Sequence, residues 1–190
     1  MLLGFNEKDN ALFNMLEYRE TLRGVDTEKL SFSEKVNSYE VIMPDDEFGF
    51  LHEAAVIEYH GTLFASWYNC SVTELEGRTP VRGKRSKDGG KTWSDVEVIA
   101  DDETGKIIYC PPVYGICDDN LYMLINEMVA ADNMHAIDLF IYNEETEKFE
   151  FLWSKPSVFK LNTNVYKLKN GKLMIPGRVA PEIDGFPRSP

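Results

Sequence analysis

The chain has 190 residues, enough for one domain with a hydrophobic core, and its 43% hydrophobic and 27% charged residues are typical of a folded globular protein. The net charge of −12 argues against nucleic acid or an anionic membrane surface as the main partner. The first residues carry no basic stretch followed by an apolar one, and no apolar run is long enough to span a bilayer, so we expect a cytoplasmic protein with no membrane association.

The N-terminal part of the chain predicts one helix, between residues 10 and 23. Asn10 can cap its first turn, apolar residues then recur on one face, and Gly24 follows as a stop signal. We therefore assign residues 1–37 to a helical or irregular extension that precedes the main domain.

From about residue 38 the pattern changes to short β-type runs separated by Gly, Pro, Asn and Asp. The runs are YEVIM (39–43), AAVIEY (54–59), TLFASWY (62–68), VEVIA (96–100), LYMLIN (121–126), IDLFIYN (137–143), FEFLW (149–153) and NVYKLK (164–169). The predicted fold class is therefore all-β, with the short helix in front.

Part of this β region repeats. An apolar run, a tight polar turn, a leucine and a second apolar run recur three times, led by Leu63, Leu121 and Leu173 at spacings of 58 and 52 residues. Such a period predicts β-propeller blades, each a four-stranded antiparallel sheet, at about 52–103, 110–156 and 162–190 within residues 38–190. An ordinary β-meander sandwich is the alternative.

The stretch SKDGGKTW (86–93) falls at the turn between the third and fourth strands of the first repeat. Asp88 can bind backbone amides two residues on, Gly89 and Gly90 permit positive φ, and Trp93 can bury its ring over the turn. The stretch lacks the spacing of a phosphate-binding loop, and no helix follows it. We interpret it as a structural clasp.

This stretch also resembles the Asp-box, S-x-D-x-G-x-T-W, of the sialidase-like β-propellers. The match lies at Ser86, Asp88, Gly90, Thr92 and Trp93. A weaker counterpart, NEETEKFEF (143–151), occupies the same place in the second repeat. The resemblance implies a propeller of the six-bladed sialidase type, and a clasp that lies away from the active site and marks fold more than function.

In such a propeller the ligand site lies on the face opposite these turns, where the loops between second and third strands meet the loops between blades. Carboxylates there can act as acid and base, arginines can clamp an acidic sugar, and Trp67 or Tyr68 can stack on a sugar ring. We place Arg82, Asp132, His135 and Asn162 on this face. Our substrate-contact candidates are His52, Glu53, Asn69, Arg78, Glu127, Asn164 and Arg178.

The resemblance implies a glycoside hydrolase that acts on a terminal sugar. Sialidases place an arginine just before the first strand, where this chain has His52, and an acid/base aspartate in the loop after the second strand, where it has Glu74 and Glu76. Glu74 and Glu76 are therefore the catalytic candidates. A non-catalytic propeller that binds carbohydrate or protein, or an inactive truncated fragment, are the alternatives.

We expect neither a metal nor a cofactor. No Cys/His spacing resembles a zinc site, and position 56, where a metalloprotease motif starting at His52 needs its second histidine, is Val56. The odd number of cysteines, Cys70, Cys110 and Cys117, predicts no disulfide framework.

A closed sialidase-like propeller has six blades, whereas this sequence predicts two and the first two strands of a third. We expect the N-terminal part of a longer protein, a truncated product, or a chain that associates with a second copy to close the ring. Residues 39–43 are the strand that would normally close the last blade, and in this chain that strand would lack its partners.

Overall fold

The computed structural model describes residues 38–131 and 133–179, and the described residues from Tyr39 onward belong to one compact unit. The predicted helix at 10–23, the extension 1–37 and Asp132 lie outside the described residues. The described part contains only strands, turns and loops, so it has no helix able to cross a membrane. The all-β prediction is confirmed for this part of the chain.

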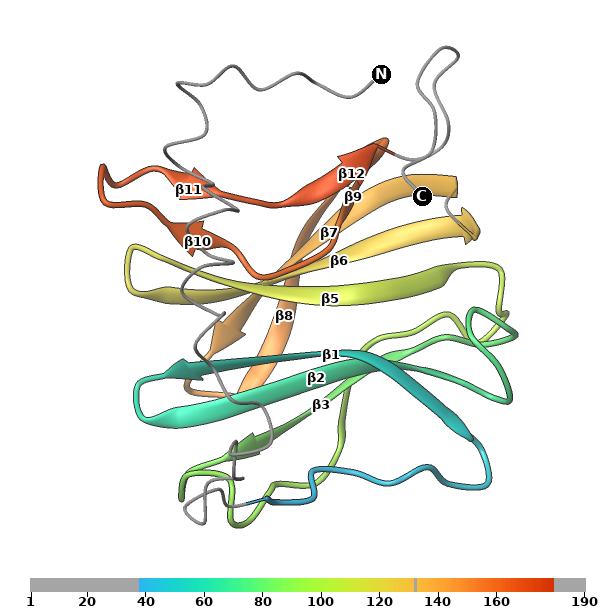
Figure 1. Ribbon diagram of the computed structural model, residues 1–190, viewed down its shortest axis with the longest axis horizontal. Helices are drawn as coiled ribbons and strands as arrows, with labels where there is room; N and C mark the ends of the chain where they lie inside the picture. The colour runs from blue at the N-terminus through green and yellow to red at the C-terminus, as the bar shows by residue number, and fades with distance from the viewer. Residues whose placement is uncertain (1–37, 132, 180–190) are drawn as a thin grey trace, which may run out of the picture. The chain divides into compact units, whose positions relative to one another are not determined.

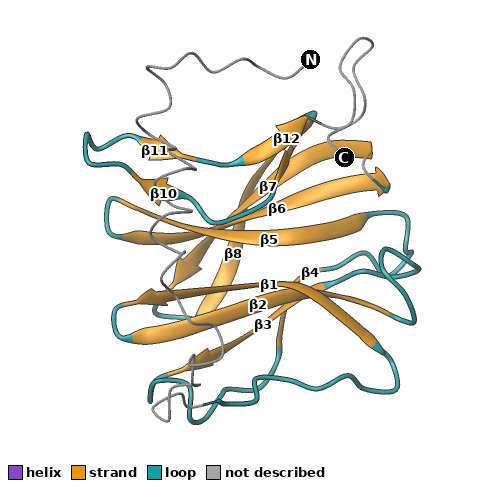
Figure 2. Ribbon diagram, in the orientation of Figure 1, coloured by secondary structure: helices purple, strands orange, loops and turns teal. Residues whose placement is uncertain are grey.

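Strands follow one another with short connections (Figures 1 and 2). They are β1 (Phe50–Tyr59), β2 (Thr62–Cys70), β3 (Val81–Ser86), β4 (Glu97–Ala100), β5 (Ile108–Cys117), β6 (Asn120–Ala130), β7 (Asn133–Asn143), β8 (Lys148–Pro156), β9 (Phe159–Leu161), β10 (Tyr166–Lys167), β11 (Leu173–Met174) and β12 (Gly177–Val179).

The first eight strands form two four-stranded antiparallel sheets, in the orders β1-β2-β3-β4 and β5-β6-β7-β8. This confirms the predicted four-stranded units. In the third repeat each expected strand is interrupted, so that β9 pairs with β12 and β10 pairs with β11. The strands β1 and β5 lie side by side where the two large sheets meet (Figure 1).

The hairpin turns explain why the first two repeats begin alike. His60 and Gly61 have φ of 47° and 75°, and Asp118 and Asp119 have φ of 47° and 59°. Two consecutive positive φ values give the tight turn whose twist matches that of antiparallel strands, and Gly, Asn and Asp adopt them most easily. Each turn therefore fixes the register of its hairpin.

One hydrophobic core joins the two sheets. Phe64 and Tyr68 of β2 pack in the same buried cluster as Tyr114 of β5 and Leu121 and Met123 of β6. Burial of this apolar surface holds the first repeat against the second.

The repeat extends to buried polar positions. Aligned on their leading leucines, Asn69 and Arg82 of the first sheet correspond to Glu127 and Asp138 of the second. Arg82 Nε donates a hydrogen bond to Asn69 Oδ1. Burial, and next the Asp138 carboxylate, raises the pKa of Glu127, and Asp138 Oδ1 is buried without a hydrogen-bond partner among the described residues. The same backbone positions therefore hold an amide and a guanidinium group in the first sheet and two carboxyl groups in the second.

Residues 39–43 do not form the strand that the sequence predicts; in the described chain they are irregular. A side chain of β3 holds this segment, since Lys84 Nζ donates to the Val41 carbonyl at 3.0 Å. In the stretch that follows, the Arg82 guanidinium lies 4.4 Å from the centre of the Phe48 ring. The prediction is wrong because apolar alternation alone does not supply the partner edge that a strand needs.

The turn from residue 86 to residue 93 is closed by its own side chains. Asp88 accepts hydrogen bonds from the Thr92 N–H at 2.9 Å and the Thr92 hydroxyl at 2.7 Å, so its amide partner lies four residues on rather than two. Ser86 Oγ accepts from the Gly90 N–H, and Trp93 Nε1 donates to the Gly90 carbonyl. The hydrogen bonds that Asp88 itself accepts, led by that from the Thr92 N–H, lower the pKa of Asp88 to about 2.

Candidate functional site

Three polar side chains form a hydrogen-bonded chain at the start of β1 and the end of β2. The Tyr68 hydroxyl donates to Glu74 Oε1 at 3.2 Å and lies 3.0 Å from His52 Nδ1. Because the single phenol proton is directed at Glu74, the matching tautomer of His52 carries its proton on Nδ1 and donates it to the phenol oxygen. His52 Nδ1 lies 3.6 Å from Glu74 Oε1. We call His52, Tyr68 and Glu74 the polar cluster.

Tyr68 is the fixed centre of the polar cluster. It is fully buried, and burial, followed by the nearby acidic groups Cys110, Glu53 and Glu74, raises its pKa far above the ordinary value of a tyrosine. The phenol therefore stays protonated at physiological pH. Its role in the cluster is to orient His52 and Glu74, whose side chains are 46% and 54% exposed.

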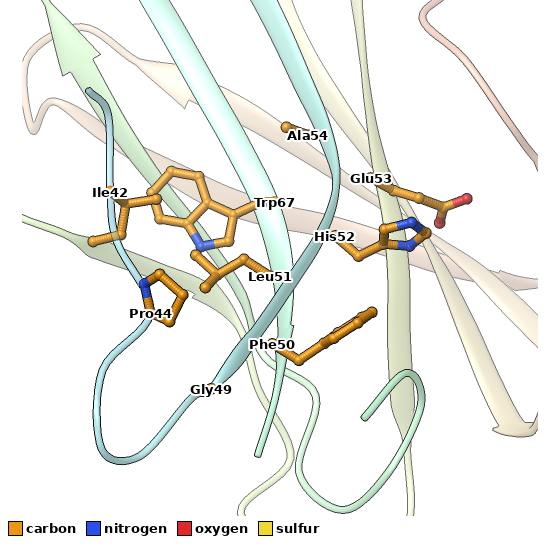
Figure 3. A pocket seen from close by; sticks show the side chains of 9 residues that line it. All are labelled: Ile42, Pro44, Gly49, Phe50, Leu51, His52, Glu53, Ala54 and Trp67. Carbon is orange, nitrogen blue, oxygen red and sulfur yellow. The ribbon is translucent and has the colours of Figure 1, made fainter. Parts of the chain in front are cut away.

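A β-bulge gives this end of β1 its unusual surface. The register with β2 shifts between His52 and Ala55, and Glu53 has a φ of 45°. In a regular strand successive side chains alternate between faces, so Glu53 would lie on the side of Leu51. Figure 3 shows instead that His52 and Glu53 both point to one side of β1, while Leu51 and Trp67 lie on the other. Glu53 therefore joins the side of the polar cluster.

A cavity of about 500 Å³ lies along this strand, lined by residues 49–54 together with Ile42, Pro44 and Trp67 (Figure 3). Its walls are apolar, and the His52 imidazole and the Glu53 carboxylate stand at its edge, on the opposite side of β1 from Leu51 and Trp67 (Figure 3). Such a mixture of a few fixed polar groups with apolar surface is typical of small-molecule sites.

The arginines predicted to contact substrate are paired with acidic groups. Arg78 donates from Nε to Asp101 Oδ1 at 2.8 Å and from Nη1 to Glu47 Oε1 at 2.8 Å, and its Nη2 also bonds Asp101. Arg82 lies on β3, not in a loop, and pairs with Asn69 and Asp45. Both arginines therefore tie neighbouring segments together.

Two further expectations about this face are corrected. Asn69 lies within β2 and is fully buried, and its Oδ1 accepts from Trp67 Nε1 as well as from Arg82. Trp67 is only 3% exposed and Tyr68 is fully buried, so neither ring has a face free for a sugar. The sequence showed these residues near a strand end but not how tightly that end is covered.

The remaining candidates are spread over several elements. Glu76 is exposed in the loop after β2, Glu127 lies within β6 rather than in a loop, and Arg178 lies on β12 opposite Lys160. Asn164 accepts from the Tyr114 N–H at 2.8 Å and donates to the Val56 carbonyl at 3.2 Å, which joins the third repeat to the first two.

Sequence reasoning missed the central position of Tyr68 and the bulge at Glu53. The turn at residues 60 and 61 alone would set Tyr68 opposite Glu53, and the bulge between His52 and Ala55 moves it opposite His52, so the turn indicates only that Tyr68 lies near residues 52 and 53. The bulge has no comparable local signal. Within the described residues, no three His, Cys, Asp or Glu side chains are arranged to hold a metal ion.

The chain resembles a solved structure with which it shares little sequence identity. The chain is similar to a GH32 β-fructofuranosidase from Bombyx mori, with a TM-score of 0.49 and 14% identity. The match covers 76% of this chain and 32% of that one, so the chain spans about a third of the length of the structure it matches. No family model matches the chain, and no curated protein matches its sequence.

Proposed function

We propose that the chain is part of a sialidase-like β-propeller that binds a carbohydrate beside the polar cluster and hydrolyses a glycosidic bond there. Two successive sheets with one strand order, and a third repeat that begins in the same way, support the propeller. The placement of His52 and Glu74 at the strand ends supports the site, since propellers gather ligand-binding residues where strands end.

The observation that carries the functional proposal is the hydrogen bonding of His52 and Glu74 to the buried Tyr68 hydroxyl beside a cavity. A buried phenol that bonds both neighbours limits their motion before any ligand arrives. Groups fixed in this way lose little conformational entropy on binding, which favours recognition of the hydroxyl groups of a sugar.

Hydrolysis needs two carboxyl groups, and those of Glu53 and Glu74 are both near enough to Tyr68 to raise its pKa. One donates a proton to the oxygen of the leaving sugar, while the other helps water to add to the anomeric carbon. The glycosidic C–O bond breaks and a new C–O bond forms to the water oxygen. One water proton stays on the new hydroxyl group, and the other passes to the second carboxylate and returns through solvent to the acid. We assign these roles to Glu53 and Glu74.

A neutral sugar fits the charges of this site better than an acidic one. Glu53 and Glu74 both carry carboxyl groups, whereas Arg78 and Arg82 are paired with acidic or amide partners. An anionic substrate would meet these carboxylates without an arginine clamp of the kind that acidic sugars need.

Binding without hydrolysis is the second candidate function, and one observation favours it. The general acid of a glycosidase is a carboxyl group whose pKa is raised by burial, but the Glu74 side chain is 54% exposed. A carbohydrate-binding propeller would use the same polar cluster and cavity and would release its ligand unchanged.

Turnover of aryl glycosides of neutral and acidic sugars by the wild-type chain, Glu74→Gln and Glu76→Gln tests these proposals. We expect cleavage of a neutral glycoside, a loss of about 100-fold or more in kcat/KM for Glu74→Gln, and little change for the exposed control Glu76→Gln. Equal activity of all three proteins would contradict the role of Glu74. Saccharide binding in titration calorimetry without turnover would favour the second candidate.

A further inference from the structure

A second cavity, of about 240 Å³, lies beside the first and is built from three successive repeats. Residues 53–56 of β1, residues 111–113 of β5 and residues 162–164 of the third repeat line it. Aligned on the leading leucines, these three segments occupy overlapping positions in their repeats. The cavity is thus a product of the repeat arrangement and requires all three segments.

The polar groups of the second cavity suit a ligand that carries hydroxyl groups. Glu53 supplies a carboxylate that accepts, Asn162 an amide that donates and accepts, and Thr163 a hydroxyl that does both. The Thr163 hydroxyl also lies 3.1 Å from the Tyr166 hydroxyl, which holds it in place. Apart from Asn164, the other described residues that line this cavity are small or aliphatic, and none of them is aromatic.

Glu53 and its neighbour Ala54 line both cavities. A ligand that extends from the first cavity into the second therefore passes the Glu53 carboxylate. The bulge directs the Glu53 side chain away from Leu51 and Trp67, which line the first cavity, so that its carboxylate meets such a ligand where the ligand crosses β1 (Figure 3).

The charges of the residues that line the two cavities limit which class of ligand can bind there. Within residues 38–131 and 133–179, Glu53 is the only ionisable residue that lines the second cavity, and the first adds only His52. An anion would be repelled there, whereas a neutral polyhydroxyl compound meets donors and acceptors without burying an unpaired charge. A cationic amine is the competing class.

We infer that the second cavity is a sugar subsite and that the ligand is a neutral oligosaccharide of at least two units, held across the two cavities at Glu53. The inference rests on the proposed carbohydrate function and deepens it, since it assigns Asn162 and Thr163 to a subsite of their own. Asn164, which bonds the Tyr114 N–H and the Val56 carbonyl, has a structural role in forming the cavity.

The experiment is titration calorimetry on the full chain with glucose, galactose and fructose and with the di- and trisaccharides of each. We expect at least one disaccharide to bind about tenfold or more tightly than its monosaccharide. Asn162→Ala and Thr163→Val should each remove most of that gain at an unchanged Tm and leave the monosaccharide Kd unchanged, while Thr163→Ser should restore it. Asn170→Ala, in the turn between β10 and β11, is the matched control and should change neither Kd.

The outcomes separate this inference from the function on which it rests. If no saccharide binds the wild-type chain, both are overturned. If monosaccharides bind but longer ones bind no better, or if Asn162→Ala and Thr163→Val both keep the gain, only the second subsite is overturned. Binding of spermidine in place of sugars, with loss of that binding in Glu53→Gln, would assign the cavities to a cationic amine instead.

Discussion

Asn126 on β6 exchanges two hydrogen bonds with the backbone of Leu161 on β9. The Leu161 N–H donates to Asn126 Oδ1 at 2.8 Å, and Asn126 Nδ2 donates to the Leu161 carbonyl at 3.0 Å. Both residues are almost fully buried. One amide side chain thus replaces a step of strand pairing between the second and third repeats.

Replacement of Asn126 should therefore destabilise the protein. Asn126→Ala leaves the Leu161 N–H and carbonyl buried without partners, which we expect to lower the free energy of unfolding by about 2–4 kcal/mol. Urea denaturation measures the change. The exposed Asn120, whose side chain donates to the Asp118 carbonyl, is the control, and Asn120→Ala should cost less than about 1 kcal/mol. Equal losses would contradict the special role of Asn126.

The packing of the third repeat on β5 predicts a rescue. A Cβ on Gly115 would lie 2.9 Å from Val165 Cβ and Cγ2. Gly115→Ala should therefore destabilise by about 1–3 kcal/mol, and the double variant with Val165→Ala should recover at least about 1 kcal/mol of that loss. A double-mutant cycle from thermal or urea unfolding measures the coupling. Additive effects would show that the two residues do not touch in solution.

The turn at Asp88 predicts a component of acid denaturation. Because its pKa is lowered from 3.8 to about 2 in the folded protein, the ionised carboxylate contributes stability above pH 3.8, which is lost as the pH falls through about 2. Tm measured from pH 5 to pH 2 should therefore fall less steeply for Asp88→Asn than for the wild type. Parallel curves would exclude Asp88 as a source of this loss.

His60 predicts the opposite dependence on pH. Its Nε2 lies 3.1 Å from Asp119 Oδ1 and its Nδ1 lies 2.9 Å from Glu144 Oε1, and these bonds, that to Asp119 first, raise its pKa above 6.5. The stabilisation is complete below pH 6.5 and is lost as the pH rises through the raised pKa. An NMR titration of the imidazole, assigned with His60→Gln, should give a value above 6.5 that falls in Glu144→Gln. A titration unaffected by Glu144→Gln would contradict the contact.

The left-handed backbone at Glu53 predicts a separation of stability from binding. Glu53→Gly relieves the strain of φ 45° and should raise the free energy of unfolding by up to about 1 kcal/mol, while it removes the carboxylate and weakens saccharide binding. Asp118→Gly, at φ 47° in an exposed turn, is the control and should leave binding unchanged. Calorimetry with the saccharide that binds the wild type measures the difference. A loss of stability in Glu53→Gly would indicate that the residue is not strained.

The parts of the fold that depend on short-range chemistry could be predicted from the sequence. The turns at residues 60–61 and 118–119 need positive φ, and the apolar runs beside them set the strands, so the four-stranded units followed. The irregular path of residues 39–43 could not be predicted, because it depends on contacts with Lys84 and other residues far along the chain.

The candidate site could be predicted only in part, because its geometry also depends on contacts between residues that are far apart in the chain. His52 and Glu74 stand near strand ends in the sequence, but their bonds to Tyr68 follow from hairpin register and burial. Arg78 pairs with Asp101, which lies 23 positions away, and the sequence alone does not show that this arginine already has an acidic partner. The direction of Glu53 depends on one extra residue in β1, which the apolar pattern does not reveal.

The correspondence of Asn69 and Arg82 with Glu127 and Asp138 constrains how these repeats can diverge. Replacement of Asn69 alone removes a hydrogen-bond partner of the Arg82 guanidinium, and a change at Glu127 or Asp138 alone alters the charge that its neighbour faces. The two positions of a pair should therefore change together over evolutionary time, and in a set of related chains they should covary within each repeat while remaining independent between repeats. A buried pair of this kind is inherited as a unit, so it can record which repeats arose from one another after the surface residues have diverged.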